Sequence, residues 1–211
     1  MLYLATPSGA EVRAAMQAGL LACMTTPAQG NVIPADALYA CDNGKFGKGW
    51  PGAAAWFAWL TATVERYGRE RCLWAVAPDV PMDATATLAE SLPWLEEIRA
   101  LGIPATFAAQ DGSEQAGLIP WHAIDVLFLA GSTEWKTSPA AHRLAHEARV
   151  RGLRVHMGRV NSRRRLRRAD AFGCTTADGT YLAFGPDTNL PRLLAWLNEL
   201  NTASALFSDG D

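Results

Sequence analysis

Short apolar runs alternate with longer amphipathic segments along most of the chain. Each run is four or five residues long, which is typical of a strand that is buried on both faces. The expected strands are Leu2–Ala5, Leu21–Met24, Leu38–Cys41, Leu73–Ala77, Ala105–Ala109, Val126–Ala130, Arg154–Met157 and Thr175–Asp178. The intervening segments predict helices at Gly9–Gly19, Gly52–Tyr67, Ala84–Leu101, Pro139–Arg151, Ser162–Phe172 and Pro191–Leu200.

This alternation predicts parallel strands that are joined by crossover helices. Eight strands within 211 residues indicate a compact TIM-like (β/α)8 barrel, shorter than the roughly 250 residues typical of that fold. An open, doubly wound sheet is the alternative. We expect one catalytic domain over residues 1–201 and a loose C-terminal tail over residues 202–211.

Composition places the chain among soluble globular proteins, since 49% of its residues are hydrophobic and 19% are charged. The N-terminal residues lack the features of a signal peptide, and no apolar stretch is long enough for a membrane span. We therefore expect a cytoplasmic protein, in the host cytoplasm if it is phage-encoded. The four cysteines are scattered and include no close pair that could hold a metal, so we expect core thiols, no metal and no cofactor.

Polar residues cluster where six of the expected strands end. The clusters are Asp42-Asn43-Gly44, Pro78-Asp79, Gln110-Asp111-Gly112, Gly131-Ser132-Thr133-Glu134, Gly158-Arg159-Val160-Asn161-Ser162 and Asp178-Gly179. In (β/α)8 barrels the active site is built from the loops at the carboxyl ends of the strands. Turn formation and helix capping also favour these residue types, but six such clusters, five of which carry a carboxylate, favour a functional site.

Several of these segments resemble motifs of the tRNA-guanine transglycosylases, in the family's order. Cys41–Phe46 is similar to the segment in which a catalytic Asp precedes Ser-Gly-Gly-Phe. Gln110–Gly112 is similar to a Gln-Gly-Gly turn, and Ala130–Gly131 to a later glycine loop. The best match is His156–Ser162, followed by a helix and then Gly173–Asp178, which parallels a Leu-Met-Gly-Val-Gly turn and the run that ends in the family's nucleophile.

Within this superfamily the chain resembles most closely the short phage-type proteins that insert 7-deazaguanines into DNA. The shared segments are GRVNS at 158–162, ADGT at 177–180 and STEWK at 132–136. The chain departs from the tRNA enzymes in lacking their zinc-binding cysteine cluster, and in having Asn43 in place of Ser and Asp111 in place of Gly. The resemblance therefore implies DNA as the partner in preference to tRNA, and a preQ0-like 7-deazaguanine base as the small-molecule substrate.

The resemblance also implies roles for two carboxylates. Asp178 would attack C1′ of the nucleotide and form a covalent ester, which the incoming base displaces with net retention of configuration. Asp42 would give a proton to the departing purine and take one from its replacement. Capping or turn formation remains an alternative reading of both residues.

Four further residues are expected to bind the base. Asp79 would accept hydrogen bonds from the N1–H and the exocyclic amine of guanine, whereas Gln110 and the amide of Gly131 would donate to O6. Asn43 occupies the family's Ser position beside the catalytic Asp. Helix capping for Asp79 and an ordinary loop role for Gln110 are the alternatives.

Five arginines fall within the helix expected after Ser162, at positions 163, 164, 165, 167 and 168. Because the strand-to-helix turn lies beside the expected site, we predict that Arg159, Arg163, Arg164 and Arg167 bind nucleic-acid phosphates. The alternative is a solvated basic helix face or a contact with acidic neighbours. The net charge of the whole chain is −2, so a nucleic acid would have to be met by a local basic patch.

Two other functions use the same residues. With water as the acceptor, the carboxylate pair would make the protein an N-glycosidase that leaves an abasic site. A non-catalytic nucleic-acid-binding barrel is the second possibility, although it would have no need of both Asp42 and Asp178. The sequence leaves the oligomeric state, the exact base and the sequence context of the substrate open.

Overall fold

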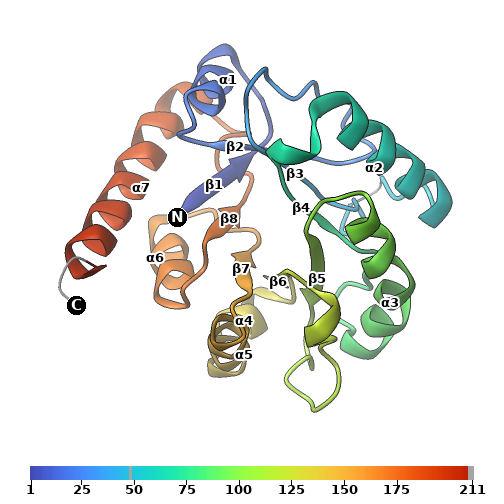
Figure 1. The fold of residues 1–211 in the computed structure, drawn as a ribbon. Helices are drawn as coiled ribbons and strands as arrows, with labels where there is room; N and C mark the ends of the chain where they lie inside the picture. The colour runs from blue at the N-terminus through green and yellow to red at the C-terminus, as the bar shows by residue number, and fades with distance from the viewer. Residues whose placement is uncertain (48, 209–211) are drawn as a thin grey trace.

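The protein is a closed barrel of eight parallel strands, numbered β1 to β8, with neighbouring strands consecutive in sequence. Figure 1 shows the computed structural model with the helices arranged outside the strands. The structure describes residues 1–47 and 49–208. The barrel, rather than an open doubly wound sheet, is therefore the fold, as the alternation of apolar runs predicted.

The strands lie where the apolar runs placed them, and no boundary differs from the expected one by more than one residue. They are β1 (Leu2–Ala5), β2 (Ala22–Thr25), β3 (Tyr39–Cys41), β4 (Cys72–Val76), β5 (Ala105–Ala109), β6 (Val126–Leu129), β7 (Arg154–Met157) and β8 (Thr176–Asp178). The barrel closes where β8 pairs with β1, with Leu4 opposite Asp178.

The six expected helices are present, together with a short helix that the sequence pattern did not predict. They are α1 (Ala10–Gln17), α2 (Ala53–Tyr67), α3 (Ala84–Ala100), α5 (Pro139–Val150), α6 (Arg163–Ala171) and α7 (Pro186–Ser208), and the short addition is α4 (Thr133–Lys136). Side chains of Asp83, Ser132, Ser138 and Ser162 cap the helices that follow them. Two 3-10 turns, Arg69–Arg71 and Trp121–Ala123, complete the regular structure.

Helix α7 corrects the expected boundary at residue 201. The helix begins five residues before Pro191, which lies inside it, and continues to Ser208. The loose tail expected from residue 202 is therefore helical over 202–208, and residues 209–211 lie outside the described residues. No helix in the described ranges is long and apolar enough to cross a membrane.

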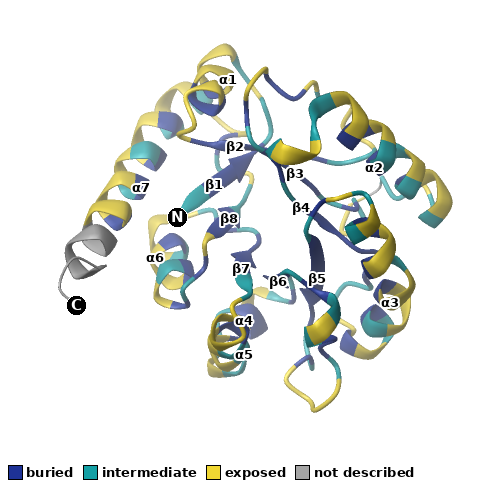
Figure 2. Ribbon diagram, viewed as in Figure 1, coloured by how far each residue is buried: buried dark blue, intermediate teal, exposed yellow. Residues whose placement is uncertain are grey.

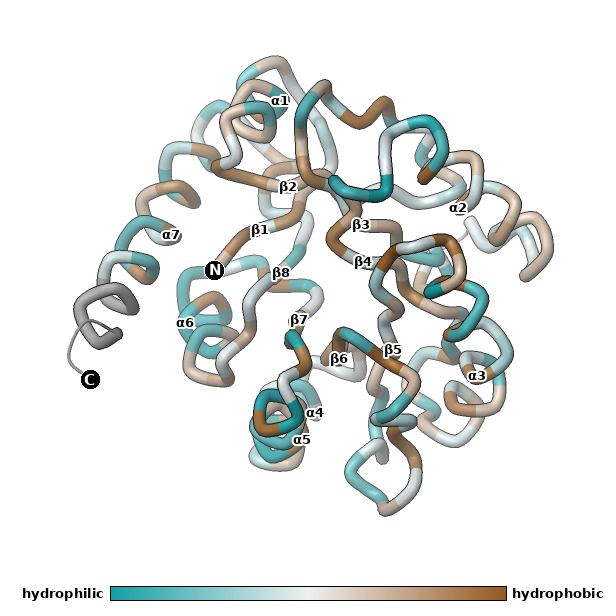
Figure 3. The backbone as a smooth tube through the Cα atoms, viewed as in Figure 1, coloured by the Kyte–Doolittle hydropathy of each residue, from teal (hydrophilic) through white to brown (hydrophobic). Residues whose placement is uncertain are grey.

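Successive strand residues point alternately into the barrel and outward to the helices, which divides the core into two parts. The inner part contains Leu4, Ala22, Met24, Ala40, Trp74, Val76, Ala108, Val126 and Phe128. The outer part joins the opposite strand faces to the helices, and its strand residues include Tyr3, Cys23 and Cys41. Figure 2 shows buried strands within helices whose outer faces are exposed, and Figure 3 shows the same distribution in hydropathy.

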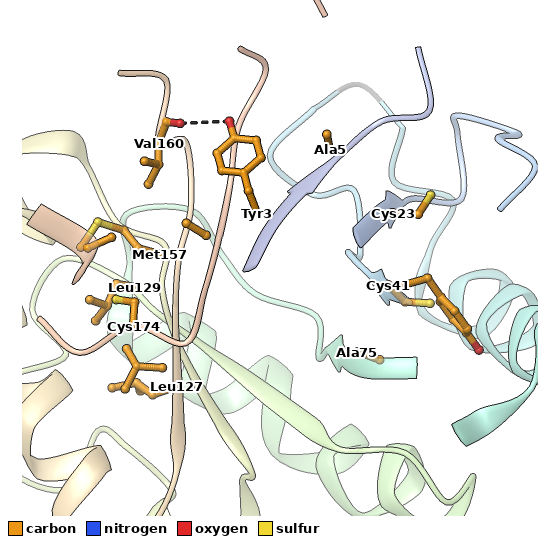
Figure 4. Packing of buried hydrophobic residues seen from close by; sticks show 14 of the residues in the cluster. Tyr3, Ala5, Cys23, Cys41, Ala75, Leu127, Leu129, Met157, Val160 and Cys174 are labelled. Carbon is orange, nitrogen blue, oxygen red and sulfur yellow. Dashed lines mark hydrogen bonds between the residues drawn. The ribbon is translucent and has the colours of Figure 1, made fainter. Parts of the chain in front are cut away.

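Figure 4 shows part of the outer core, where Tyr3 bridges the first strand and the loop after β7. The Tyr3 hydroxyl donates to the Val160 carbonyl oxygen at 3.0 Å. Burial raises the pKa of Tyr3, so the phenol keeps the proton that this bond needs. The contact fixes the loop that carries Arg159 and Asn161 against the strand that borders β8.

Candidate active site

A pocket of about 460 Å³ opens at the carboxyl ends of the strands. Its lining comes from several βα loops and strand ends, and consists of Asp42, Asn43, Phe46, Val76, Asp79, Gln110, Phe128, Ala130, Thr133, Gly158, Arg159, Asn161, Arg165, Asp178 and Thr180. This is where (β/α)8 barrels place catalytic residues. The structure thus brings together Asp42, Asn43, Asp79, Gln110, Arg159 and Asp178, which the sequence assigned to one site.

Asp178 is the last residue of β8, and a histidine on the neighbouring strand holds its side chain. Its Oδ1 lies 2.9 Å from Nε2 of His156, while Nδ1 of the same ring lies 2.9 Å from the Thr176 hydroxyl. Asp178 Oδ2 has no hydrogen-bond partner within the described part of the chain, and the residue lines the pocket. One carboxylate oxygen is therefore fixed and the other faces the space that a substrate would occupy.

The histidine that holds Asp178 is itself held by aromatic packing. His156 is fully buried, and its ring centroid lies 4.6 Å from those of both Trp74 and Phe128. These rings point into the barrel below the pocket, so the imidazole has little freedom to rotate. The arrangement fixes the orientation of Asp178 from below.

Asp42 follows β3 and forms a tight turn with its own backbone. The Gly44 amide donates to Asp42 Oδ1 at 2.7 Å, and Gly44 adopts a positive φ of 81° that this turn requires. Burial of the carboxyl group raises the pKa of Asp42 to about 7, with further contributions from the negative charges of Asp178 and Asp79, against the lowering effect of the Gly44 bond. A carboxyl group with this pKa can donate or accept a proton near neutral pH.

A buried amide network holds Asp79. Asn43 Nδ2 donates to its Oδ1 at 2.8 Å, and Gln110 Nε2 donates to its Oδ2 at 2.6 Å. Burial raises the pKa of Asp79, whereas the bonds from Asn43 and Gln110 lower it. Gln110 Oε1 accepts from the Met82 amide at 2.9 Å, which fixes the side-chain orientation of Gln110. Each oxygen of Asp79 keeps a second acceptor position, and Gln110 keeps a second N–H, for a ligand.

Gly131 lies outside the pocket lining, and its amide is already engaged. The Gly131 N–H donates to the Ala109 carbonyl at 3.1 Å, so in this structure it is not directed at a base. A Cβ at this position would lie 2.6 Å from the Asp111 carboxylate and 2.6 Å from the Trp135 ring. The glycine therefore permits close packing, and Asp111 accepts from the Ser132 amide and hydroxyl.

Arg159 lies at the pocket rim rather than on the outer surface. Its backbone is left-handed, with a φ of 58°, and its guanidinium donates to the carbonyl oxygens of Ala130 and Gly131. The guanidinium also lies 4.5 Å from the centre of the Phe46 ring, which is largely exposed. Arg159 thus connects three loops at the mouth, and the phosphate contact expected for it stays a prediction.

The arginines of α6 divide into two groups. Arg163 and Arg167 both bind Glu199 of α7, at 2.5 and 2.7 Å, on the exposed surface between the two helices. Arg164 instead borders a second hollow next to the pocket. The arginines expected to bind phosphate therefore do not lie on one surface, because Arg163 and Arg167 pair with Glu199 whereas Arg164 faces the second hollow.

Three residues of the site were not assigned a role from the sequence. The sequence pattern marks His156 only as part of a motif, although its inward position follows from the alternation along β7. Phe46 lies at the mouth in a glycine-rich loop. Lys136 is buried beneath Gly158, to whose carbonyl its ammonium donates, and burial together with Arg159 lowers its pKa to about 7. Nothing in the local sequence around Lys136 distinguishes it from an exposed helix residue.

Metal-binding groups do not gather in the described ranges. No group of three or more His, Cys, Asp or Glu side chains there is placed to hold a metal ion. The four cysteines are all buried as free thiols. The polar groups of the pocket are instead carboxylate, amide, hydroxyl and guanidinium.

Comparison with known proteins supports the fold only. No protein-family model and no curated protein matches the chain. The Bacillus subtilis YkuI protein, with an EAL domain and solved with its substrate c-di-GMP and calcium, is 16% identical, with a TM-score of 0.50 over 81% of this chain and 44% of that one. A designed cube-shaped protein cage is 13% identical, with a TM-score of 0.55 over 99% of this chain and 74% of that one.

A third solved structure, the GH113 β-mannanase AaManA from Alicyclobacillus acidocaldarius, is 14% identical and has a TM-score of 0.36 over 70% of this chain and 49% of that one. The chain thus spans less than half the length of the YkuI and mannanase chains. At these identities the similarity to the YkuI protein and the cage supports the fold and no more.

Proposed function

We propose that this protein is an enzyme that exchanges guanine in a nucleic acid, DNA in preference to tRNA, for a preQ0-like 7-deazaguanine. The observation that carries the proposal is the pair of carboxyl groups in one pocket with different surroundings. Asp42 has a pKa of about 7, whereas Asp178 is held by a buried histidine with one oxygen open to the pocket. Two carboxyl groups in distinct environments are the usual basis for separate nucleophile and acid/base roles.

The first half of the reaction removes guanine. Asp178 Oδ2 attacks C1′ of the nucleotide, the bond from C1′ to N9 breaks, and its electron pair leaves with the base. Protonated Asp42 gives its proton to a ring nitrogen of that base, so guanine leaves neutral and Asp42 becomes a carboxylate. His156 keeps Asp178 Oδ1 in place, which leaves Oδ2 as the attacking atom.

The second half inserts the new base. N9 of the 7-deazaguanine loses its proton to the Asp42 carboxylate and attacks C1′, and the ester bond to Asp178 breaks. Both carboxyl groups return to their starting protonation states. Two inversions at C1′ give net retention.

The amide network is suited to a guanine-like edge. Asp79 has an acceptor position on each oxygen for N1–H and the exocyclic amine, and Gln110 has a free N–H for O6. A site whose buried polar groups need these partners rejects bases that lack them. Phe46, at the mouth, offers an aromatic face on which the base can stack.

The test is mass analysis of nucleosides from DNA and tRNA after expression with a supplied 7-deazaguanine, with Asp178→Asn as the matched control. We expect a 7-deazaguanine nucleoside in DNA from cells with the wild-type protein and none from cells with the variant. Its absence from both nucleic acids, or equal amounts with the variant, would overturn the proposal. Free guanine and abasic sites, formed whatever base is supplied, would identify an N-glycosidase instead.

A further inference from the structure

A second hollow, of about 540 Å³, adjoins the pocket on the side of α6. We call it the arginine groove, and its lining consists of Thr133, Thr137, Asn161, Ser162, Arg164, Arg165 and Arg168. Thr133, Asn161 and Arg165 also line the pocket. The groove therefore continues from the site where the reacting sugar would lie.

The charge of the arginine groove has one sign. Three arginines line it, and no carboxylate does so among the described residues. Arg164 makes no ion pair or side-chain hydrogen bond within the part of the chain that the structure describes. Arg168 only approaches the Thr137 carbonyl, at 3.4 Å, and Arg165 donates to the Arg159 carbonyl at 3.2 Å. Three guanidinium groups thus share one hollow without a neutralising partner.

Two other arginines of α6 are paired with a carboxylate. Arg163 and Arg167 point to Glu199, whose two carboxylate oxygens accept one bond from each. The bonds from both arginines lower the pKa of Glu199, so the carboxylate stays ionised at neutral pH. Since the chain as a whole carries a charge of −2, the unpaired positive charge of the groove is a local feature of one face of α6.

We infer that the arginine groove binds phosphate groups of the nucleic-acid strand on either side of the nucleotide whose base enters the pocket. The inference rests on the proposed function, because it places the strand by the sugar that Asp178 would attack. Guanidinium groups donate paired hydrogen bonds to phosphate oxygens, and hydroxyl and amide side chains such as those of Thr133 and Asn161 add further donors. Contacts of this kind hold the backbone while one base is turned out of the stack.

The experiment measures the affinity for a fluorescein-labelled 20-nucleotide DNA, single-stranded and duplex, by anisotropy over a range of NaCl concentrations. The test variant is Arg164→Ala with Arg168→Ala. The control is Arg163→Ala with Arg167→Ala, which removes the same charge from the same helix. Thermal unfolding of each variant checks the fold.

We expect the groove variant to weaken binding and to reduce the slope of log affinity against log salt by about 1.4 to 1.8, which corresponds to two lost phosphate contacts. The control should keep the wild-type slope. An unchanged slope in the groove variant, or an equal loss in both variants, would overturn the inference. The inference would also be overturned if inorganic phosphate or dGMP displaced the labelled strand at the same concentration as an unlabelled 20-nucleotide strand does. That result would indicate a site for small anions.

Base exchange is measured on the same protein samples. Groove-dependent strand binding without any exchange by the wild type would leave the groove assignment in place and remove the proposed function. Exchange by the groove variant at the wild-type rate and affinity would remove the groove assignment and leave the proposed function in place.

Discussion

The two sides of the pocket hold their carboxyl groups in opposite ways. On the side of β3 to β5, Asp42 and Asp79 lie within a network of amides from Asn43, Gln110 and the backbone. On the side of β7 and β8, Asp178 depends on His156, which is fixed between aromatic rings inside the barrel. On the amide side, Asp42 has a pKa of about 7 and can gain or lose a proton near neutral pH. On the imidazole side, His156 holds one oxygen of Asp178 and leaves the other without a partner among the described residues. The first arrangement suits proton transfer and recognition, and the second suits attack on carbon.

The largest effect should come from Asp178→Asn. An amide cannot form the sugar ester, so base exchange should fall on the order of 10⁶-fold, as it does when other enzymes lose a nucleophile. Denaturing electrophoresis with a labelled oligonucleotide should show a shifted band for wild type that disappears when the 7-deazaguanine is added. If the variant still forms that band, the nucleophile is another residue and the two sides have been assigned wrongly.

Asp42→Asn should cost about 10²- to 10⁴-fold in exchange, the usual value of acid/base assistance. Unlike Asp178→Asn, it should still form a small amount of the covalent band with a good leaving base. In wild type the first half-reaction should slow as pH rises above about 7, because Asp42 must be protonated to act and loses its proton above that pH. A pH profile that is the same in wild type and variant would contradict the assignment.

The same carboxyl group should affect stability with a defined sign. Its pKa is about 7 when folded and near 4 when unfolded, so the folded state binds the extra proton between these values. Ionised Asp42 therefore destabilises the fold, and the free energy of unfolding should decrease from pH 4 to pH 7. Urea unfolding should show this decrease in wild type and a smaller one in Asp42→Asn.

His156→Phe should reduce exchange by about 10- to 150-fold, the cost of one hydrogen bond to a charged group of roughly 1.5–3 kcal/mol. His156→Gln, which retains a donor, should recover part of the loss. Binding of the nucleic acid should be unchanged in both variants, as measured by anisotropy. Equal activity of the Phe and Gln variants would show that the imidazole serves packing alone.

The smallest effect is expected from a change in the amide network around Asp79. Asn43→Ala removes a donor from buried Asp79 and should lower the free energy of unfolding by about 1–3 kcal/mol. The control is Asn31→Ala, whose side chain donates to Gln29 in an exposed hydrogen bond and has no other hydrogen bond among the residues that the structure describes. Matching losses in the two variants, measured by urea unfolding, would mean that the Asp79 network is not a structural unit.

Local pattern predicted the strands and the carboxyl-end location of the site, because each apolar run is buried on both faces and is followed by a polar loop. It did not predict how the arginines of α6 divide, since their partner Glu199 lies on α7 and the pairing depends on how two helices pack. It also did not predict that the Gly131 amide is engaged, because the hydrogen bonding between β5 and β6 continues past Leu129, where Ala130 and Gly131 both donate to the Ala109 carbonyl. His156 could have been found by alternation, because its inward position matches those of Phe128 and Thr176 in the paired strands.

The pairing of Leu4 with Asp178 has a consequence for the order of events during synthesis. The residue expected to attack the sugar lies at the seam where the first and last strands meet, so its backbone belongs to the strand pairing with the largest separation in sequence. Such contacts form late, because a long loop must close before they are made. A nascent chain that has not yet released β8 from the ribosome lacks Asp178 in the pocket, and under the proposed function it therefore lacks its nucleophile.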